Sequence, residues 1–363
     1  MEYPDAPPTA IKGRGAASNP EGRFETLRHQ AEDDGWRNAL LDEAAPRPRT
    51  EVTEERARSV ITRNDSPDIG FDQALNPFRG CEHGCVYCFA RPSHSYLNLS
   101  PGLDFETKIR AKGNLAEVLR AELAKPGYVP KPINIGSNTD PYQPIEKKWR
   151  LTRAALEVLA ECRHPCTIVT KNALVERDLD MLATMARDRL VQVFVSVNSL
   201  DNHLAAKLEP RASAPHRRLK AIATLAEAGV PVGVLVAPII PALNDKDMEA
   251  VLARAHEAGA RCAGYTVLRL PWELKQLFRE WLALHAPQRA EHVMSLVRQM
   301  NAGRDYDSDF RTRMRGQGVF AELLRKRFEI ACRKHGFGRA RELQLDTSRF
   351  LPPRKPSPQG ELF

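Results

Sequence analysis

Long apolar runs are missing from this chain of 363 residues. No stretch approaches the roughly 20 consecutive apolar residues that a membrane-spanning helix requires. The first residues, Met1-Glu2-Tyr3-Pro4-Asp5, carry neither the basic start nor the apolar segment of a secretory signal. We therefore expect a cytoplasmic protein without a membrane partner.

Cysteine is also scarce, with seven residues in the whole chain, and the odd number in so long a chain argues against a disulfide framework. Unpaired cysteines suit a reducing compartment. The apolar fraction of 42% and the charged fraction of 28% are those of an ordinary soluble globular protein. A chain of this length can bury a large core in one or two domains.

Three of the seven cysteines lie within eight residues of one another, as Cys81, Cys85 and Cys88 in the spacing C-x3-C-x2-C. Three thiolates at this spacing can hold one face of an iron–sulfur cube. A [4Fe–4S] cluster has four irons, so three protein ligands leave one iron open to a small molecule. The motif predicts a cluster of this kind with a second cofactor or substrate bound to it.

A structural zinc site is the alternative interpretation of these cysteines. Zinc takes four ligands, and His83 or His94 would complete a Cys3His set. A zinc ribbon usually brings a second C-x2-C pair, and the other four cysteines do not supply one. The spacing therefore favours the iron–sulfur cluster.

Short apolar runs alternate with helical patterns through the middle of the chain. The runs predict strands at residues 132–136, 167–170, 191–197, 230–238 and 263–270, with a further short strand around 74–78. Apolar residues at three-to-four spacing predict helices at 152–163, 175–187, 215–228 and 245–258. Strands that alternate with helices form a parallel sheet with right-handed crossovers, and six such units make a partial (β/α)6 barrel.

The two ends of the chain have a different character. Residues 1–55 show little hydrophobic periodicity, and we expect them to be mostly disordered, with one short helix near 23–34. We expect the barrel to span 56–285, a helical C-terminal extension to span 286–350, and a loose tail to follow at 351–363. Helical patterns at 272–285, 287–300 and 319–335 support the extension.

Several further runs around the cysteines resemble those of one protein family. They are Asn-Pro-Phe-Arg-Gly at 76–80, Thr-Asp-Pro-Tyr-Gln-Pro at 139–144, Glu-Pro-Arg at 209–211 and Ala-Pro-Ile-Ile-Pro at 237–241. Together with the cysteine motif they resemble the radical S-adenosylmethionine (SAM) superfamily. Within it they resemble the branch of spore photoproduct lyase and the DNA-repair photolyase-like proteins.

The resemblance implies a radical SAM partial barrel and an enzyme of unknown substrate. A [4Fe–4S] cluster on Cys81, Cys85 and Cys88 would split SAM into methionine and a 5′-deoxyadenosyl radical that abstracts hydrogen. It implies a reductant such as flavodoxin or ferredoxin as a partner. It also implies SAM contacts for residues at the strand ends, namely Tyr87, Asp140, Lys171, Ser196, Asn198 and Arg211. Chemistry in β/α barrels gathers at these carboxyl ends.

Positive charge is concentrated near the C-terminus. Residues 304–355 hold 14 Lys and Arg against 7 Asp and Glu, a net charge of +7 out of +8 for the whole chain. Such a region is compatible with nucleic acid, and a solvated basic helix face is the alternative. A different class of function is therefore a non-catalytic nucleic-acid-binding protein stabilised by zinc or by a cluster.

Overall fold

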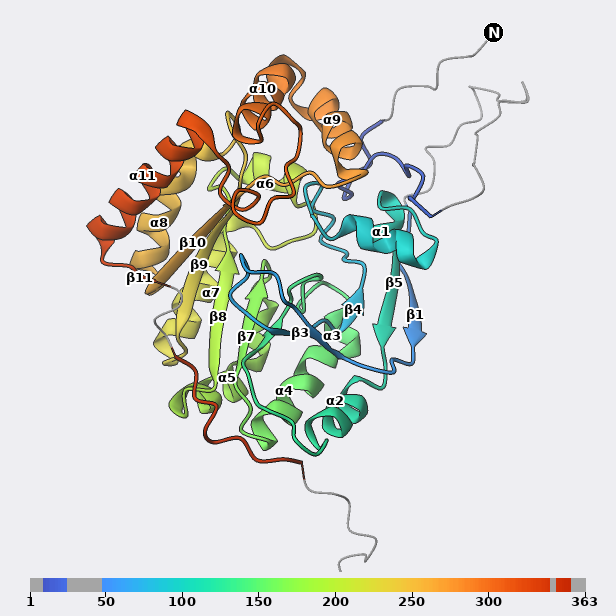
Figure 1. Cartoon of the computed structure of the whole chain (residues 1–363), viewed down its shortest axis with the longest axis vertical. Coiled ribbons are helices and arrows are strands. Elements are labelled where there is room, and N and C mark those ends of the chain that lie inside the picture. The colour runs from blue at the N-terminus through green and yellow to red at the C-terminus, as the bar shows by residue number, and fades with distance from the viewer. Residues whose placement is uncertain (1–8, 25–47, 340–343, 354–363) are drawn as a thin grey trace, which may run out of the picture.

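The computed structural model describes residues 9–24, 48–339 and 344–353. Its main feature is an eight-stranded sheet in the order β11-β10-β9-β8-β7-β6-β3-β2 (Figure 1). The six strands from β3 to β10 in this order are parallel to their neighbours. They are β3 (Gln73–Leu75), β6 (Ile133–Ile135), β7 (Cys166–Thr170), β8 (Val191–Ser196), β9 (Val232–Ile239) and β10 (Cys262–Val267).

The two edges of this parallel set do not pair with each other. β2 (Ile61–Arg63) adds antiparallel to β3, and β11 (Gly338–Arg339) adds parallel to β10. The sheet is therefore open, as the partial (β/α)6 barrel predicted from the sequence requires.

Amphipathic helices cover the sheet because each turns an apolar stripe inward, as Ala155, Leu156 and Leu159 do in α4. α7 and α8 are each followed by a glycine at positive φ, Gly229 and Gly259, which confirms the predicted helix ends. The covering helices are α2 (Leu115–Leu123), α4 (Leu151–Glu161), η2 (Ala173–Asp178), α5 (Leu179–Arg187), α7 (Pro215–Glu227), η3 (Asp245–Asp247) and α8 (Met248–Glu257).

A second, three-stranded sheet in the order β1-β5-β4 lies beside the barrel (Figure 1). It consists of β1 (Glu51–Glu55), β4 (Phe78–Arg79) and β5 (Lys108–Lys112). The cysteine segment leaves β4, passes through the 3-10 helix η1 (Arg91–Leu97), and returns through α1 (Leu103–Thr107) to β5. This sheet therefore anchors both ends of the segment that carries the cysteines.

Helices α9 (Leu274–His285) and α10 (Ala290–Met300), joined by η4 (Pro287–Arg289), lie at the end to which the arrows of β7 and β8 point (Figure 1). Their apolar side chains share a core cluster with Val86 and Tyr87 of the cysteine segment. The short helices α3 (Glu146–Trp149) and α6 (Asn202–Leu208) complete this end, and α11 (Gly318–His335) packs on α8. Within the described ranges, no helix has the length and apolarity to cross a membrane.

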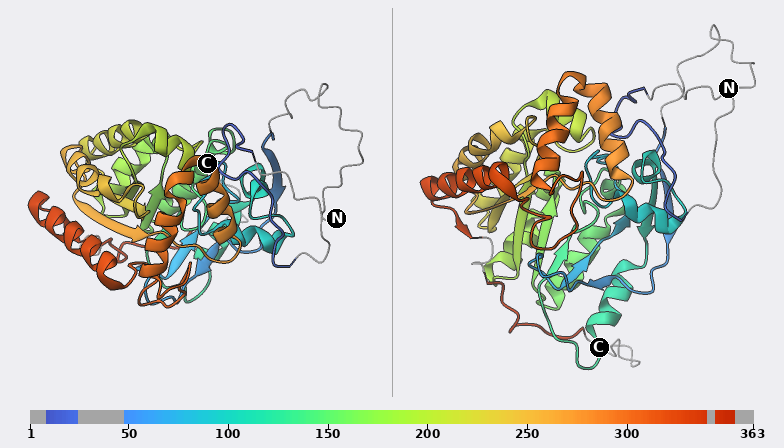
Figure 2. Two further views of the ribbon diagram at one scale, coloured as in Figure 1. Left: turned by 90° about the horizontal axis from the view of Figure 1, so that it is seen from above. Right: turned by 45° about the horizontal axis from the view of Figure 1, so that its top comes forward.

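The N-terminal segment differs from its prediction. Residues 9–24, which we call the strap, lie against α1 and α9 in both views of Figure 2, and β1 pairs with β5 along its full length. In residues 9–24 and 48–55 the structure therefore differs from the mostly disordered segment predicted over 1–55. Polar contacts rather than a periodic apolar face hold the strap, so hydrophobic periodicity gave no sign of it. Most of the helix predicted near 23–34 lies outside the described residues.

Candidate active site

The cysteine loop is shaped by one arginine. Arg91 is fully buried, and its guanidinium donates to four backbone carbonyls, of Cys85 (2.8 Å), Gly84 (3.1 Å), Pro101 (3.1 Å) and Gly102 (2.8 Å). A guanidinium offers five donors in a fixed plane, so one side chain can fix a whole turn. Arg91 thereby fixes the backbone around the second cysteine of the motif.

A buried carboxylate joins this arginine to the strap. Glu106 pairs with Arg91 and accepts the backbone N–H groups of Gly15 (3.0 Å) and Ala16 (2.8 Å). Ala16 is itself buried, in the same apolar cluster as Cys85. The strap is therefore the outer wall of the cysteine loop.

All three motif cysteines line one cavity of about 560 Å³ at the carboxyl ends of the barrel strands. Tyr87, Asp140, Lys171 and Ser196 line the same cavity. Four of the six predicted SAM-contact residues are thus brought together with the three cysteines. The size is within the range of ordinary ligand sites.

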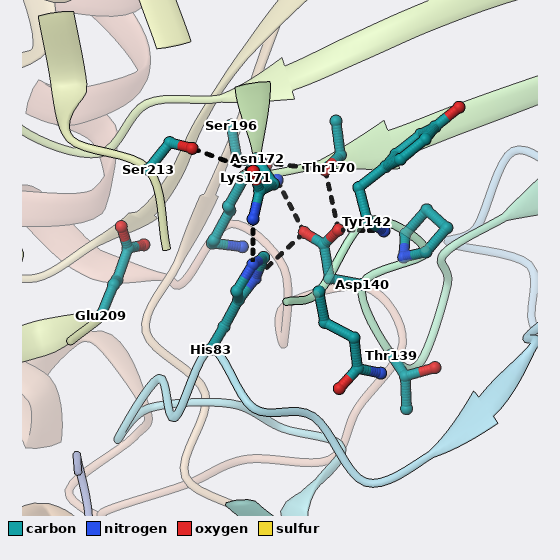
Figure 3. A network of polar contacts seen from close by, with 12 residues as sticks. His83, Thr139, Asp140, Tyr142, Thr170, Lys171, Asn172, Ser196, Glu209 and Ser213 are labelled. Atoms are coloured by element: carbon teal, nitrogen blue, oxygen red, sulfur yellow. Dashed lines mark hydrogen bonds and ion pairs between the residues drawn. The ribbon is translucent and has the colours of Figure 1, made fainter. Parts of the chain in front are cut away.

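Asp140 is held in a polar network drawn in Figure 3. It accepts the Thr170 hydroxyl (2.7 Å) and the Lys171 backbone N–H (2.6 Å), and it lies 3.3 Å from His83 Nδ1. Burial alone would raise the pKa of Asp140, but His83 and these hydrogen bonds hold it at about 2. Asp140 is therefore an ionised carboxylate whose oxygens are already bound by groups of the protein. His83 pairs with Asp140 rather than completing a Cys3His set.

Lys171 contributes the unpaired positive charge at the cysteine end of the cavity. Among the described residues its ammonium has no hydrogen-bond or ion-pair partner, although its backbone N–H is bound to Asp140. Burial favours the neutral amine, yet the charges of Cys85, Glu209 and Asp140 raise the pKa of Lys171. The side chain remains a cation available to an anionic group.

Tyr87 lies between the cysteine loop and a second buried ion pair. Its hydroxyl donates to Glu209, which also pairs with Arg218, and all three side chains are buried. Asn198 Nδ2 lies 3.4 Å from the Tyr87 oxygen. The tyrosine ring borders the cavity, and its hydroxyl is turned into this network.

The remaining predicted contacts are placed differently. β8 ends at Ser196, so Asn198 lies beyond the strand and does not line the cavity. Arg211 pairs with Glu82 (3.0 Å) and reaches Thr50 (3.5 Å), also away from the cavity lining. Residues two apart share a face only within a strand, so Asn198 does not share the orientation of Ser196.

The motif cysteines need a positively charged group beside them to be stable as thiolates. Burial, with the charges of Asp140 and the neighbouring thiols, raises the pKa of Cys81, and burial beside Glu209 raises that of Cys85. A coordinating metal reverses this preference, because it stabilises the thiolate directly. The donor set therefore fits an iron–sulfur cluster. In the part of the chain that the structure describes, no three His, Cys, Asp or Glu side chains are grouped to hold a single metal ion.

The other four cysteines lie away from the cavity lining. Cys166 and Cys262 are the first residues of β7 and β10, at the opposite end of the barrel from the site. Cys162 follows α4, and Cys332 lies in α11. Each is a free thiol whose pKa is raised by burial, the mark of a small core residue.

Comparisons with known proteins agree with this site. The model of the radical SAM superfamily matches residues 75–255. An uncharacterised protein of Mycobacterium bovis is 37% identical over 234 residues, which cover 63% of this chain and 68% of that protein. An uncharacterised protein of Methanocaldococcus jannaschii is 28% identical over 195 residues, or 54% of this chain and 70% of that protein. The chain belongs to the radical SAM superfamily.

Solved structures with the same fold include two of spore photoproduct lyase. A cysteine-to-serine mutant has a TM-score of 0.54 at 17% identity, and a mutant with bound AdoMet and dinucleoside spore photoproduct has 0.52 at 18%. Each match covers 79% of this chain and 80% of the other. The predicted fold class is thereby confirmed, and the protein is a radical SAM enzyme whose substrate is open.

Proposed function

We propose that this enzyme binds a [4Fe–4S] cluster on Cys81, Cys85 and Cys88, and SAM in the cavity beside it. The observation that carries the proposal is that three cysteines of one loop line the same cavity as an unpaired, partly buried cation, Lys171. When bound, the cluster and SAM supply one-electron cleavage to methionine and a 5′-deoxyadenosyl radical, which takes a hydrogen atom from the substrate. Flavodoxin or ferredoxin is the class of reductant that supplies the electron.

The protein's own contribution is binding, orientation and exclusion of water. Lys171 would pair with the SAM carboxylate as a point charge. The Tyr87 ring would lie against the adenine, fixed there by the Glu209 carboxylate that its hydroxyl binds. Ser196 would donate to the carboxylate or ribose, whereas Asp140 would act indirectly by holding His83 and the backbone of Lys171.

Nucleic acid is the substrate class that we propose for test. The support is the exposed basic face of α11, with Lys326, Arg333 and Lys334 exposed, and with exposed Arg325 paired to the exposed Glu329 at 3.1 Å. Arg327 does not belong to this face, because its guanidinium donates two hydrogen bonds to the Glu249 carboxylate, from Nε at 2.7 Å and from Nη2 at 2.8 Å. A solvated helix surface is the alternative, and salt-dependent binding distinguishes the two.

The test is anaerobic reconstitution with iron and sulfide, followed by SAM and dithionite, with 5′-deoxyadenosine measured by chromatography. Replacing any one of Cys81, Cys85 or Cys88 by alanine is expected to abolish product, because one iron loses its protein ligand. Cys332→Ala is the matched control and should retain iron content and product. Full product from any of the three motif variants would falsify the cluster assignment. Stoichiometric zinc without iron would instead support the nucleic-acid-binding alternative.

A further inference from the structure

Part of the cavity lining comes from segments that none of the family-like runs include, and we call this part the mouth. Residues 62–71 contribute Asn64 and Phe71, the segment after β10 contributes Arg269, and the loop before α11 contributes Arg313 and Met314. A group bound at the mouth would therefore contact residues outside the runs that resemble the family.

The two arginines at the mouth differ in how their charge is balanced. Arg313 donates from Nε (2.5 Å) and Nη2 (2.7 Å) to the carboxylate of Asp68, which we call the mouth clasp. This bidentate pair joins segments 245 residues apart and neutralises Arg313. The clasp shapes the mouth and leaves little attraction for a ligand anion at that position.

Arg269 has no such partner. Its guanidinium carbon lies 4.9 Å from the centroid of the Phe89 ring, and its Nη1 lies 3.5 Å from the thioether sulfur of Met314. Its Nε is buried without a hydrogen-bond partner, and among the described residues no carboxylate pairs with Arg269. A guanidinium without a carboxylate partner can bind an oxyanion through its remaining N–H groups by charge-assisted hydrogen bonds. Phe89 follows the third cysteine directly, so the guanidinium is held beside the cluster loop.

We propose that Arg269 binds an oxyanion of the substrate, a carboxylate or a phosphate group, whose body lies against the apolar mouth surface of Phe71 and Met314. This inference rests on the proposed function for the statement that the mouth receives the substrate. The planar fork of a guanidinium matches both oxyanions, and stacking on an aromatic ring holds that fork in one orientation. Arg269 is a substrate-binding residue in this account.

The carboxylate of SAM is assigned to the other cation. The backbone N–H of Lys171 is bound to Asp140, whereas the Arg269 guanidinium lies against Met314 of the mouth. Both side chains line the cavity, so it offers one cation to SAM and another to a second anion.

The experiment titrates the anaerobically reconstituted enzyme, saturated with SAM and without reductant, by calorimetry. The probes are phenyl phosphate, benzoate and benzyl alcohol, which share a ring and differ in the charged group. We expect one of the anions to bind about tenfold or more tightly than benzyl alcohol, as one charge-assisted contact provides. The preferred anion identifies the oxyanion. Arg269→Gln should remove the preference and Arg269→Lys should keep part of it.

Arg315→Gln is the matched control, because Arg315 stacks on Tyr265 at 4.1 Å and does not line the cavity; it should keep the full preference. The inference is overturned if wild type shows no preference, if Arg269→Gln retains it, or if the anion binds only when SAM is left out. Thermal melting of each variant shows that it has folded. Failure to form 5′-deoxyadenosine would refute the proposed function, whereas SAM cleavage without anion preference would refute this inference alone.

Discussion

Adding a single methyl group to the strap should disturb the cysteine loop. An ideal Cβ on Gly15 lies 1.8 Å from the carbonyl oxygen of Gly84 and 3.2 Å from the backbone nitrogen of Val86. Both neighbours are backbone atoms of the loop between the cysteines, and neither can rotate away as a side chain can. In Gly15→Ala, either the strap lifts or the loop shifts.

The size of the effect follows from what the strap would lose. Lifting it breaks the hydrogen bonds from Gly15 and Ala16 to the Glu106 carboxylate (3.0 and 2.8 Å) and exposes Ala16. Each hydrogen bond to a charged group contributes about 1.5–3 kcal/mol, so the two together give about 3–6 kcal/mol. In a chain of 363 residues that loss lowers Tm by about 4–8 °C. If the loop shifts instead, the three cysteines move away from the positions in which they can bind one cluster, and the iron content falls.

The assay compares Tm by circular dichroism with iron and sulfide content after reconstitution. Gly13→Ala is the control, since it lies in the same strap and its added Cβ meets no atom within 4 Å. Its φ of +81° still makes alanine unfavourable there, by about 1–2 kcal/mol. Wild-type Tm together with wild-type iron content in Gly15→Ala would show that the strap does not bear on the loop.

Three further predictions concern separate parts of the molecule. Asp68→Asn should lower Tm at pH 7, and the difference from wild type should shrink as pH falls below 4. The mouth clasp lowers the pKa of Asp68, so its stabilisation is present above the ordinary carboxyl pKa and disappears as the folded carboxyl protonates; a constant difference would count against it. Tyr87→Phe should cost about 1–3 kcal/mol in denaturant unfolding, because Glu209 loses a buried donor, and an unchanged midpoint would contradict this. If α11 binds nucleic acid, Arg325→Glu with Lys326→Glu should weaken oligonucleotide binding and flatten its salt dependence; identical affinity would remove α11 from consideration.

The barrel strands and helices were predictable from their burial. A strand buried on both faces has a continuous apolar run in its sequence, and a helix buried on one face has apolar residues at three-to-four spacing. β9 and α7 are examples, with bounds within a few residues of the prediction. The three-stranded sheet was missed for the same reason. β1 reads Glu-Val-Thr-Glu-Glu, and β5 reads Lys-Ile-Arg-Ala-Lys, an alternation of only five residues. Neither shows the continuous apolar run by which the barrel strands were predicted.

Site residues within the motifs were predictable, and their partners were not. Cys81, Tyr87 and Lys171 follow from the motif and the strand ends. Arg211 was assigned to SAM, but Glu82 of the cysteine loop takes its charge. Nothing in the local sequence around Arg269 distinguishes it from a surface arginine, since its character comes from segments distant in sequence.

The strap also has a consequence for the order in which the protein is made. Its residues are synthesised first, but Ser18 bonds to Glu280, 262 residues later in the chain. At about 5–20 residues per second, this bond to α9 cannot form for roughly 10–50 s after the strap is synthesised. The bonds of Gly15 and Ala16 to Glu106 can form earlier, so in that interval the strap is held from the side of the cysteine loop alone. Synthesis itself therefore provides a period in which the wall over the three thiols is less firmly held and iron and sulfide can reach the loop from that side.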